Sequence, residues 1–150
     1  MRKKLLIIFT ILILIGGGIW FYCCSLINVN SVAIDYFEQL KTETIAAGYS
    51  SNFYVVSGKR HQWHNDLLVE FGGAASKSRH LKGEAIDIIV LDVNQDGTAN
   101  SKDVDIIYNI LNRKIIKNKG GIGTYKNDKT RFGKQMIHFD CRGYKARWHR

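Results

Sequence analysis

Hydrophobic residues recur along the chain at two different spacings, and each spacing predicts a different kind of element. Segments 32–47 and 101–111 carry apolar residues every three or four positions, which predicts two amphipathic helices, with Ser101 as the expected N-cap of the second. Residues 63–71 are a further candidate helix. β-Branched and aromatic residues dominate three more segments, which we expect to be strands, at 52–56, 85–91 and 135–140. The pattern therefore predicts a domain of mixed α and β structure.

The first thirty residues have a different character from the rest of the chain. A basic cluster at residues 2–4 precedes an uncharged, largely apolar run from Leu5 to Cys23. At about 1.5 Å per residue, this run reaches roughly 28 Å, close to the thickness of the hydrocarbon core of a bilayer. We therefore expect a transmembrane helix within residues 1–30, and one domain over residues 31–150 on the periplasmic or extracellular side. A cleaved signal peptide and a lipoprotein signal are the alternatives, and both export the same domain.

Charge and cysteine content narrow the choice of partners. The 150 residues suffice for one domain with its own core, and 22 Lys and Arg against 13 Asp and Glu give a net charge of +9. Three of these charges belong to the basic cluster at residues 2–4, and the remaining excess suits an anionic partner, whether nucleic acid, a phospholipid surface or an acidic cell-wall glycan. The basic residues are scattered, and the domain is expected to face away from the cytoplasm, so we expect no nucleic-acid partner. Cys141 has no cysteine partner within the domain and is expected to be a small buried residue.

The strongest chemical signal is a set of metal-ligating residues in two separate segments. His80 and Asp87 lie in one local unit, and His138 lies on a distant strand. Two imidazoles and one carboxylate, with a coordination position left for water, describe a catalytic zinc site. A carboxylate at Asp87, within an apolar strand, is costly unless a cation or strong donors match it. The alternative is that Asp87 caps a turn or pairs with Arg79 or Arg60, while both histidines are polar surface residues.

A second motif follows the strand at 85–91. Residues 92–103 place oxygen atoms in the order used by the EF-hand calcium loop, with Gly97 at the sharp turn. The final position is Asp instead of Glu, which makes the loop similar to the dockerin variant. We therefore predict a structural calcium site, in which Thr98 contributes its backbone carbonyl; an ordinary Asp-Gly turn is the alternative. The predicted ligands are Asp92, Asn94, Asp96, Thr98, Asn100 and Asp103.

The order of residues 78–87 also resembles a known family. Their pattern, S-x-H-x-x-G-x-A-x-D, is similar to the signature of the zinc D-Ala-D-Ala metallopeptidases, whose fold also occurs in hedgehog signalling proteins. The resemblance runs from about residue 35 to 148, and its later elements look like those of the YcbK-like branch. It implies an α+β fold, with a small central antiparallel sheet and flanking helices that carry a zinc site. The supporting elements are Ser57–Arg60, His64–Asn65, Gly120–Tyr125 and Ile137–Asp140.

The resemblance also implies a role for individual residues. His80, Asp87 and His138 would be the zinc ligands, and Arg60 and Ser78 would hold carboxylate or carbonyl groups of the substrate. The alternative for Arg60 is an ordinary surface cation. The substrate would be a peptide, and zinc would activate a water molecule to attack it.

One departure from the family pattern leaves two functions open. The dipeptidase and endolysin branches have an acidic residue three positions before the last histidine, where this chain has Gln135. Asp140, on the same strand face as His138, is then the predicted proton acceptor. The first function is a zinc peptidase that acts on peptidoglycan stem peptides as a D,D-carboxypeptidase or an endopeptidase. The second is a non-catalytic module, stabilised by zinc and calcium, that binds cell-wall peptide or another protein.

Overall fold

The computed structural model describes residues 2–24, 26–72, 74–126 and 135–150, with the side chains of 2–6, 19–24 and 72 outside the description. Four α-helices, a five-stranded sheet, one 3-10 turn (η1) and one π-helical turn (η2) make up the described part. In chain order these are α1 (Arg2–Cys24), α2 (Ser31–Ala46), β1 (Phe53–Ser57), α3 (Gln62–Gly72), η1 (Arg79–Lys82), β2 (Ala85–Val90), α4 (Ser101–Ile110), η2 (Leu111–Ile115), β3 (Gly121–Tyr125), β4 (Met136–Asp140) and β5 (Ala146–His149). The α+β class expected from the sequence is confirmed.

The strands pair in the order β1-β2-β4-β3-β5. The first four are antiparallel to their neighbours, whereas β5 runs parallel to β3. The expectation of an antiparallel sheet is therefore wrong for this edge, and the sheet is mixed. After β4 the chain reverses direction and crosses to the outer edge of β3, where it forms β5. Because β3 and β5 both run antiparallel to β4, they are parallel to each other.

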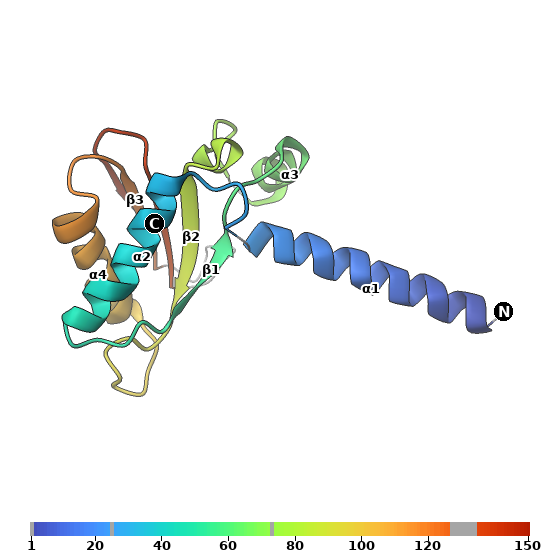
Figure 1. Ribbon diagram of the computed structural model, residues 1–150, viewed down its shortest axis with the longest axis horizontal. Coiled ribbons are helices and arrows are strands. Elements are labelled where there is room, and N and C mark those ends of the chain that lie inside the picture. The colour runs from blue at the N-terminus through green and yellow to red at the C-terminus, as the bar shows by residue number, and fades with distance from the viewer. Residues whose placement is uncertain (1, 25, 73, 127–134) are drawn as a thin grey trace.

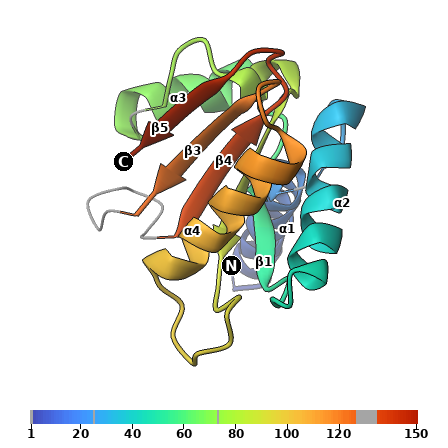
Figure 2. The same ribbon diagram turned by 90° about the vertical axis from the view of Figure 1, so that its left-hand side faces the viewer.

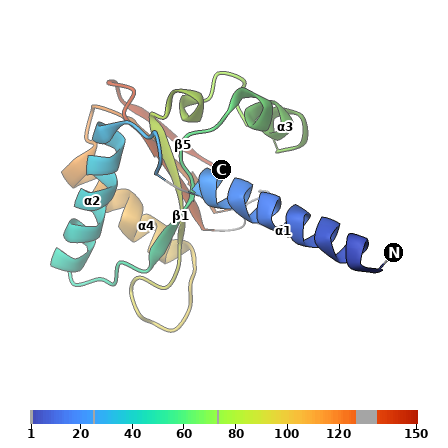
Figure 3. The ribbon, with the colours of Figure 1, turned by 45° about the vertical axis from the view of Figure 1, so that its right-hand side comes forward.

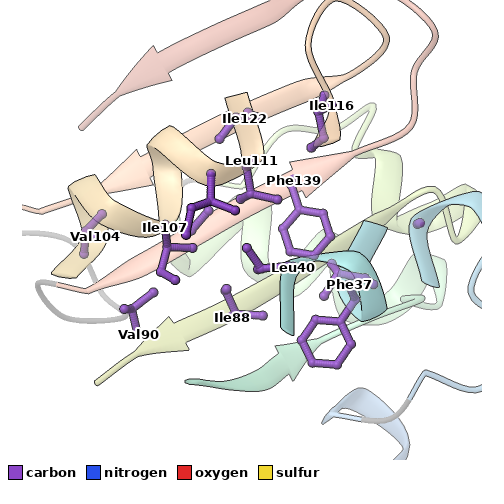
Figure 4. Packing of buried hydrophobic residues seen from close by; sticks show 14 of the residues in the cluster. Phe37, Leu40, Ile88, Val90, Val104, Ile107, Leu111, Ile116, Ile122 and Phe139 are labelled. Carbon is purple, nitrogen blue, oxygen red and sulfur yellow. The ribbon is translucent and has the colours of Figure 1, made fainter. Parts of the chain in front are cut away.

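Helices α2 and α4 cover one face of the sheet, while α3 lies on the other side (Figures 1 and 2). The covered face holds the core, in which Phe37 and Leu40 of α2 meet Ile88 of β2 and Phe139 of β4 (Figure 4). Because side chains alternate along a strand, burying Ile88 and Phe139 against the helices turns Asp87 and His138 to the opposite face. Packing of the core thus selects the face on which the polar residues meet.

The N-cap of helix α4 lies one residue before the expected one. Asn100, not Ser101, is the N-cap, with an extended backbone (φ −153°, ψ −173°) and a side chain that accepts a hydrogen bond from the backbone N–H of Lys102. Asp103 completes a capping box by accepting from the backbone N–H of Asn100 at 2.8 Å. An asparagine caps as well as a serine, so the residue type by itself did not separate the two positions.

Helix α1 extends away from the domain, and large apolar residues between Ile7 and Ile15 are exposed on it (Figures 1 and 3). Over the residues that the structure describes, no helix has the length and apolar character needed to cross a membrane, and the predicted transmembrane helix is not found there. The side chains of the basic cluster at residues 2–4 lie outside the described residues.

Candidate metal centre

One row of paired residues crosses the sheet and carries the candidate site. Asp87 on β2 lies opposite His138 on β4, and His138 lies opposite Gly123 on β3. Ser57 on β1 and Trp148 on β5 extend the row at its two ends. Residues paired across a ladder point to the same face of the sheet, so side chains from four strands lie along one line, while Gly123 of β3 contributes none.

His80 reaches this row from the short turn η1, just before β2. The Ser78 hydroxyl caps the turn by accepting a hydrogen bond from the backbone N–H of His80 at 3.4 Å. Gly83 ends it in the left-handed conformation (φ 70°), where a Cβ would lie 2.5 Å from the backbone oxygen of Asn28. Residues 78–87 therefore consist of a capping serine, a single turn and the start of a strand, and this order places His80 beside Asp87. The structure gives Ser78 this local role.

Three potential ligand atoms converge above the sheet. His138 Nδ1 lies 2.7 Å from Asp87 Oδ1 and 3.2 Å from His80 Nε2. His80 Nε2 lies 3.1 Å from the same Asp87 oxygen. All three residues are buried. Among the described residues, their ligand atoms lie within 4.8 Å of one another, close enough to hold one metal ion.

The outer nitrogen of each histidine has its own partner. His80 Nδ1 lies 2.6 Å from the backbone oxygen of Gly58, and His138 Nε2 lies 3.1 Å from Asp140 Oδ2. Because both partners are acceptors, these two nitrogens carry the protons, and His80 Nε2 and His138 Nδ1 offer lone pairs. Two lone pairs and a carboxylate oxygen within about 3 Å of one another repel unless a proton or a metal cation lies among them. Two imidazoles and one carboxylate are a common zinc donor set, so the residues fit zinc.

Asp140 lies behind His138, on the edge of the ring that faces away from the other ligand atoms. Arg142 donates two side-chain hydrogen bonds to this carboxylate, from Nε to Oδ1 at 2.8 Å and from Nη2 to Oδ2 at 2.6 Å. The backbone N–H of Gly121 also donates to Oδ1 at 3.0 Å. Burial opposes the charge of Asp140, but the bonds from His138 and Arg142 outweigh it and hold the pKa of this carboxyl well below its usual range.

These contacts do not favour the role of proton acceptor that the sequence predicted for Asp140. The imidazole ring of His138 separates the carboxylate from the ligand atoms, and a carboxyl with so low a pKa is a weak base. Its geometry is instead that of a carboxylate that orients a metal-binding histidine. Gly121 makes the arrangement possible, because a Cβ there would lie 2.3 Å from Asp140 Oδ2 and 2.8 Å from Arg142 Nε.

Arg60 lies on the opposite side of the site and is also buried, at 7% exposure. Its Nη2 donates to Asp87 Oδ2 at 2.5 Å, and its Nε donates to the Ser57 hydroxyl at 2.8 Å. One oxygen of Asp87 is thus held by Arg60, while the other faces the two histidines. The ordinary surface cation considered for Arg60 is excluded, and the pairing of Asp87 with Arg60 is found together with the converging histidines.

The protonation states of the three residues differ. Burial lowers the pKa of His80, whereas hydrogen bonds to Asp140 and Asp87 outweigh burial and raise the pKa of His138. Burial also disfavours the charge of Asp87, but the two histidines outweigh it and hold its pKa well below the usual value. In the absence of metal, the carboxylate is therefore ionised, and His138 is the residue that takes up an additional proton.

The family model described as Peptidase M15 matches residues 27–127, two thirds of the chain. The chain belongs to the Peptidase M15 family. A comparison with curated proteins gives no match.

Membership of the Peptidase M15 family supports zinc as the metal, since these peptidases are zinc-dependent. The matched residues include His80 and Asp87 but end before His138. His138, the third candidate ligand, is brought beside the other two by the pairing of β2 with β4. The YcbK-like branch and the dockerin-like loop stay predictions within this Peptidase M15 member.

Gln135 lies immediately before β4, and its backbone oxygen accepts a hydrogen bond from the N–H of Val90 at 2.8 Å. This bond continues the pairing of β2 and β4 beyond Met136, so Gln135 holds the start of the strand that carries His138. An amide side chain does not take up a proton at neutral pH. Gln135 therefore cannot serve as the general base that an acidic residue at this position would provide.

The loop over residues 92–100 is closed by its own side chains. Asp92 accepts hydrogen bonds from the backbone N–H groups of Asp96 and Gly97 at 3.1 and 2.9 Å. Asp103 is fully buried and accepts from the backbone N–H groups of Val93, Asn94 and Asn100. The loop is therefore a turn closed by hydrogen bonds within the chain, and the calcium site stays a prediction.

Zinc binding should become tighter as the pH rises. Because His80 is neutral and Asp87 is ionised, zinc has to displace only the proton on His138, so the affinity should rise about tenfold per pH unit below the raised pKa and level off above it. The raised pKa also means that this proton stabilises the metal-free fold at low pH and that the stabilisation is lost as the pH passes that pKa. Chelator competition between about pH 6 and pH 8 measures the slope.

The variant Asp140→Asn tests whether His138 is the source of this pH dependence. Removing the negative charge behind His138 should lower the pKa of that histidine, so the affinity should level off at a lower pH. An affinity that does not depend on pH in the unsubstituted protein would contradict the assignment of His138 as a ligand.

Proposed function

We propose that this protein is a zinc-dependent peptidase that cleaves peptidoglycan stem peptides, as a D,D-carboxypeptidase or an endopeptidase. The observation that carries the proposal is the convergence of His80, Asp87 and His138 in a member of the Peptidase M15 family. The net charge of +9 supports an anionic polymer such as the cell wall as the setting of the substrate.

The chain's own side chains would hold the metal in a defined orientation. His80 would bind through Nε2 and His138 through Nδ1, because the opposite nitrogen of each ring donates a hydrogen bond elsewhere. Asp87 would bind through Oδ1, since Arg60 holds Oδ2. When bound, zinc would lower the pKa of a water molecule and polarise the carbonyl group of the peptide.

Arg60 and Ser78 are proposed to hold the substrate, as the family resemblance implies. A guanidinium has five N–H donors, and the bonds of Arg60 to Asp87 and Ser57 use two of them. The same cation can therefore orient a metal ligand and offer donors to a peptide carboxylate. Ser78 would contribute from the cap of the turn that carries His80.

A second function is favoured by the lack of a well-placed base. Gln135 occupies the position where an acid is expected, and Asp140 is held behind His138. Without a proton acceptor, the same fold would bind zinc and peptide but hydrolyse slowly. The alternative is therefore a non-catalytic zinc- and calcium-stabilised module that binds cell-wall peptide or another protein.

Zinc-loaded protein incubated with muropeptides should release D-alanine or peptide fragments. His80→Ala should lose both zinc and cleavage, because it removes one ligand, while Lys82→Ala in the same turn removes only an exposed side chain and serves as the matched control. Asp140→Asn should weaken zinc affinity about 10–100-fold, since it alters the partner that orients His138. Metal analysis and mass spectrometry of the products measure the two effects.

The results separate the two functions. Full zinc occupancy without cleavage of any stem peptide would rule out the peptidase and favour the binding module. In that case Gln135→Glu tests the cause, because a gain of cleavage would show that only the carboxylate was missing. Cleavage that does not depend on zinc would contradict both functions.

We also propose that residues 92–103 bind calcium, which is supported by the order of their oxygen atoms. Calcium at millimolar concentration should raise the Tm of the full chain, because the ion binds the folded loop in preference to the unfolded one. Asp92→Ala should abolish this shift, and Asp35→Asn, an exposed residue on α2, is the charge-matched control. An unchanged Tm would leave the loop as a turn that is stable without an ion.

The proposed location is outside the cytoplasm, attached to a membrane through α1 or secreted after its removal. The exposed apolar residues of α1 support this proposal, since such a surface is costly in water. The full chain should remain in the membrane pellet after carbonate extraction, and a variant that begins at Ser31 should be released. Recovery of the full chain in the soluble cytoplasmic fraction would contradict the proposal.

A further inference from the structure

Trp148 lies beside the metal centre in the same row of the sheet as His138. The two rings have their centroids 5.3 Å apart at an angle of 44°. Gly123 lies between them in the pairing, opposite both residues. The indole therefore extends across β3 toward the metal ligand on β4.

Gly123 is what allows this close approach. A Cβ at this position would lie 2.2 Å from both Nε1 and Cε2 of Trp148, far inside van der Waals contact. The backbone of Gly123 is an ordinary strand, so the glycine is needed for the space it leaves and not for its conformational freedom. The indole rests directly on the strand.

The indole also fixes the position of a hydroxyl group. Trp148 donates from Nε1 to the hydroxyl of Tyr125 at 3.2 Å. Tyr125 lies two residues after Gly123 and so points to the same face of the sheet. An indole N–H can only donate, so the tyrosine oxygen is the acceptor in this bond and its own proton is directed elsewhere.

Arg142 supports the indole from another direction. Its guanidinium carbon lies 5.3 Å from the centroid of the Trp148 ring, and the guanidinium is itself held by Asp140. The same arginine thus positions the carboxylate behind His138 and the ring beside it. Trp148 is half-buried, which leaves part of the indole accessible.

We propose that Trp148 and Tyr125 form a substrate-binding wall of the metal centre. The indole bounds the space beside His138, and the Tyr125 hydroxyl donates a hydrogen bond to a carbonyl oxygen of the bound peptide. Tyr125 would contact the substrate, and Trp148 is a positioning residue that holds the hydroxyl in place. The proposal rests on the proposed peptide substrate and adds the residues that orient it.

Two substitutions test the wall through activity. In the zinc-loaded protein, Tyr125→Phe should reduce kcat/KM for a peptide ending in D-Ala-D-Ala about 100-fold, with most of the loss in kcat, because one donor to the developing charge is removed. Trp148→Phe should have a similar effect, since it leaves the hydroxyl without its donor. Zinc affinity should change little in either variant. Tyr54→Phe, at an exposed tyrosine on β1, is the matched control and should keep full activity.

Tryptophan fluorescence tests the wall independently of hydrolysis. The chain has three tryptophans, so Trp20→Phe with Trp63→Phe leaves Trp148 as the only tryptophan, whose emission is excited selectively at the red edge of the absorption band. Cobalt bound at the metal centre should quench this emission strongly, and the peptide ending in D-Ala-D-Ala should change it in the zinc-loaded protein. Gly123→Ala should weaken both responses, because it displaces the indole.

The outcomes distinguish this inference from the proposed function. Cleavage by the unsubstituted protein together with full activity of Tyr125→Phe would overturn the role of the hydroxyl. A Trp148 signal that responds to neither cobalt nor peptide would overturn the wall. Absence of cleavage together with a peptide-dependent Trp148 signal would remove the peptidase function but support the wall as part of a binding site.

Discussion

The antiparallel pairing of β2 with β4 is the constraint on which the rest of the site depends. It sets Asp87 directly opposite His138, and a shift of one residue would turn one of them into the hydrophobic core. That shift is prevented because Ile86 and Ile88 on one strand, and Ile137 and Phe139 on the other, are fully buried beneath α2 and α4. The core and the candidate metal centre therefore lie on opposite faces of the sheet, and one strand register fixes both.

Charge balance is the second organising feature. Asp87 and Asp140 are both buried, and each is matched by an arginine, Arg60 on one side and Arg142 on the other. A buried carboxylate without such a partner would cost several kcal/mol of stability. Each carboxylate also contacts a histidine. Oδ1 of Asp87 faces His80 and His138, and Oδ2 of Asp140 contacts the outer nitrogen of His138. The two ion pairs thus hold the cluster in a shape that suits a cation.

How much of this was accessible from the sequence differs between residues. The motif around His80 and Asp87 is local, so its spacing already indicated a metal site, and His138 was recognisable by its position on an apolar strand. The role of Asp140 was not, because the residue type and the strand face are the same for a base and for an orienting partner. Only the contacts of Arg142 and Gly121 distinguish the two. The contact with Gly121 joins residues 19 positions apart, and the bond from Arg142, two positions away, depends on side-chain orientations that the sequence does not show. Strands β3 and β5 were not predicted, because β3 is short and contains two glycines, and β5 is short, half-exposed and without a regular apolar pattern.

The amino-acid sequence is enough to predict several local features of this protein: the metal-ligating motif around His80, the apolar strands, the amphipathic helices and the family to which the motif points. Local backbone preferences and hydrophobic spacing are enough for these features. Which side chains meet across the sheet is visible only once the chain is folded. Gly123 makes room for Trp148, Arg60 and Arg142 each bind a carboxylate, and Asp140 lies behind His138. Such contacts depend on strand order and register, which arise when the whole core packs and which no single segment encodes.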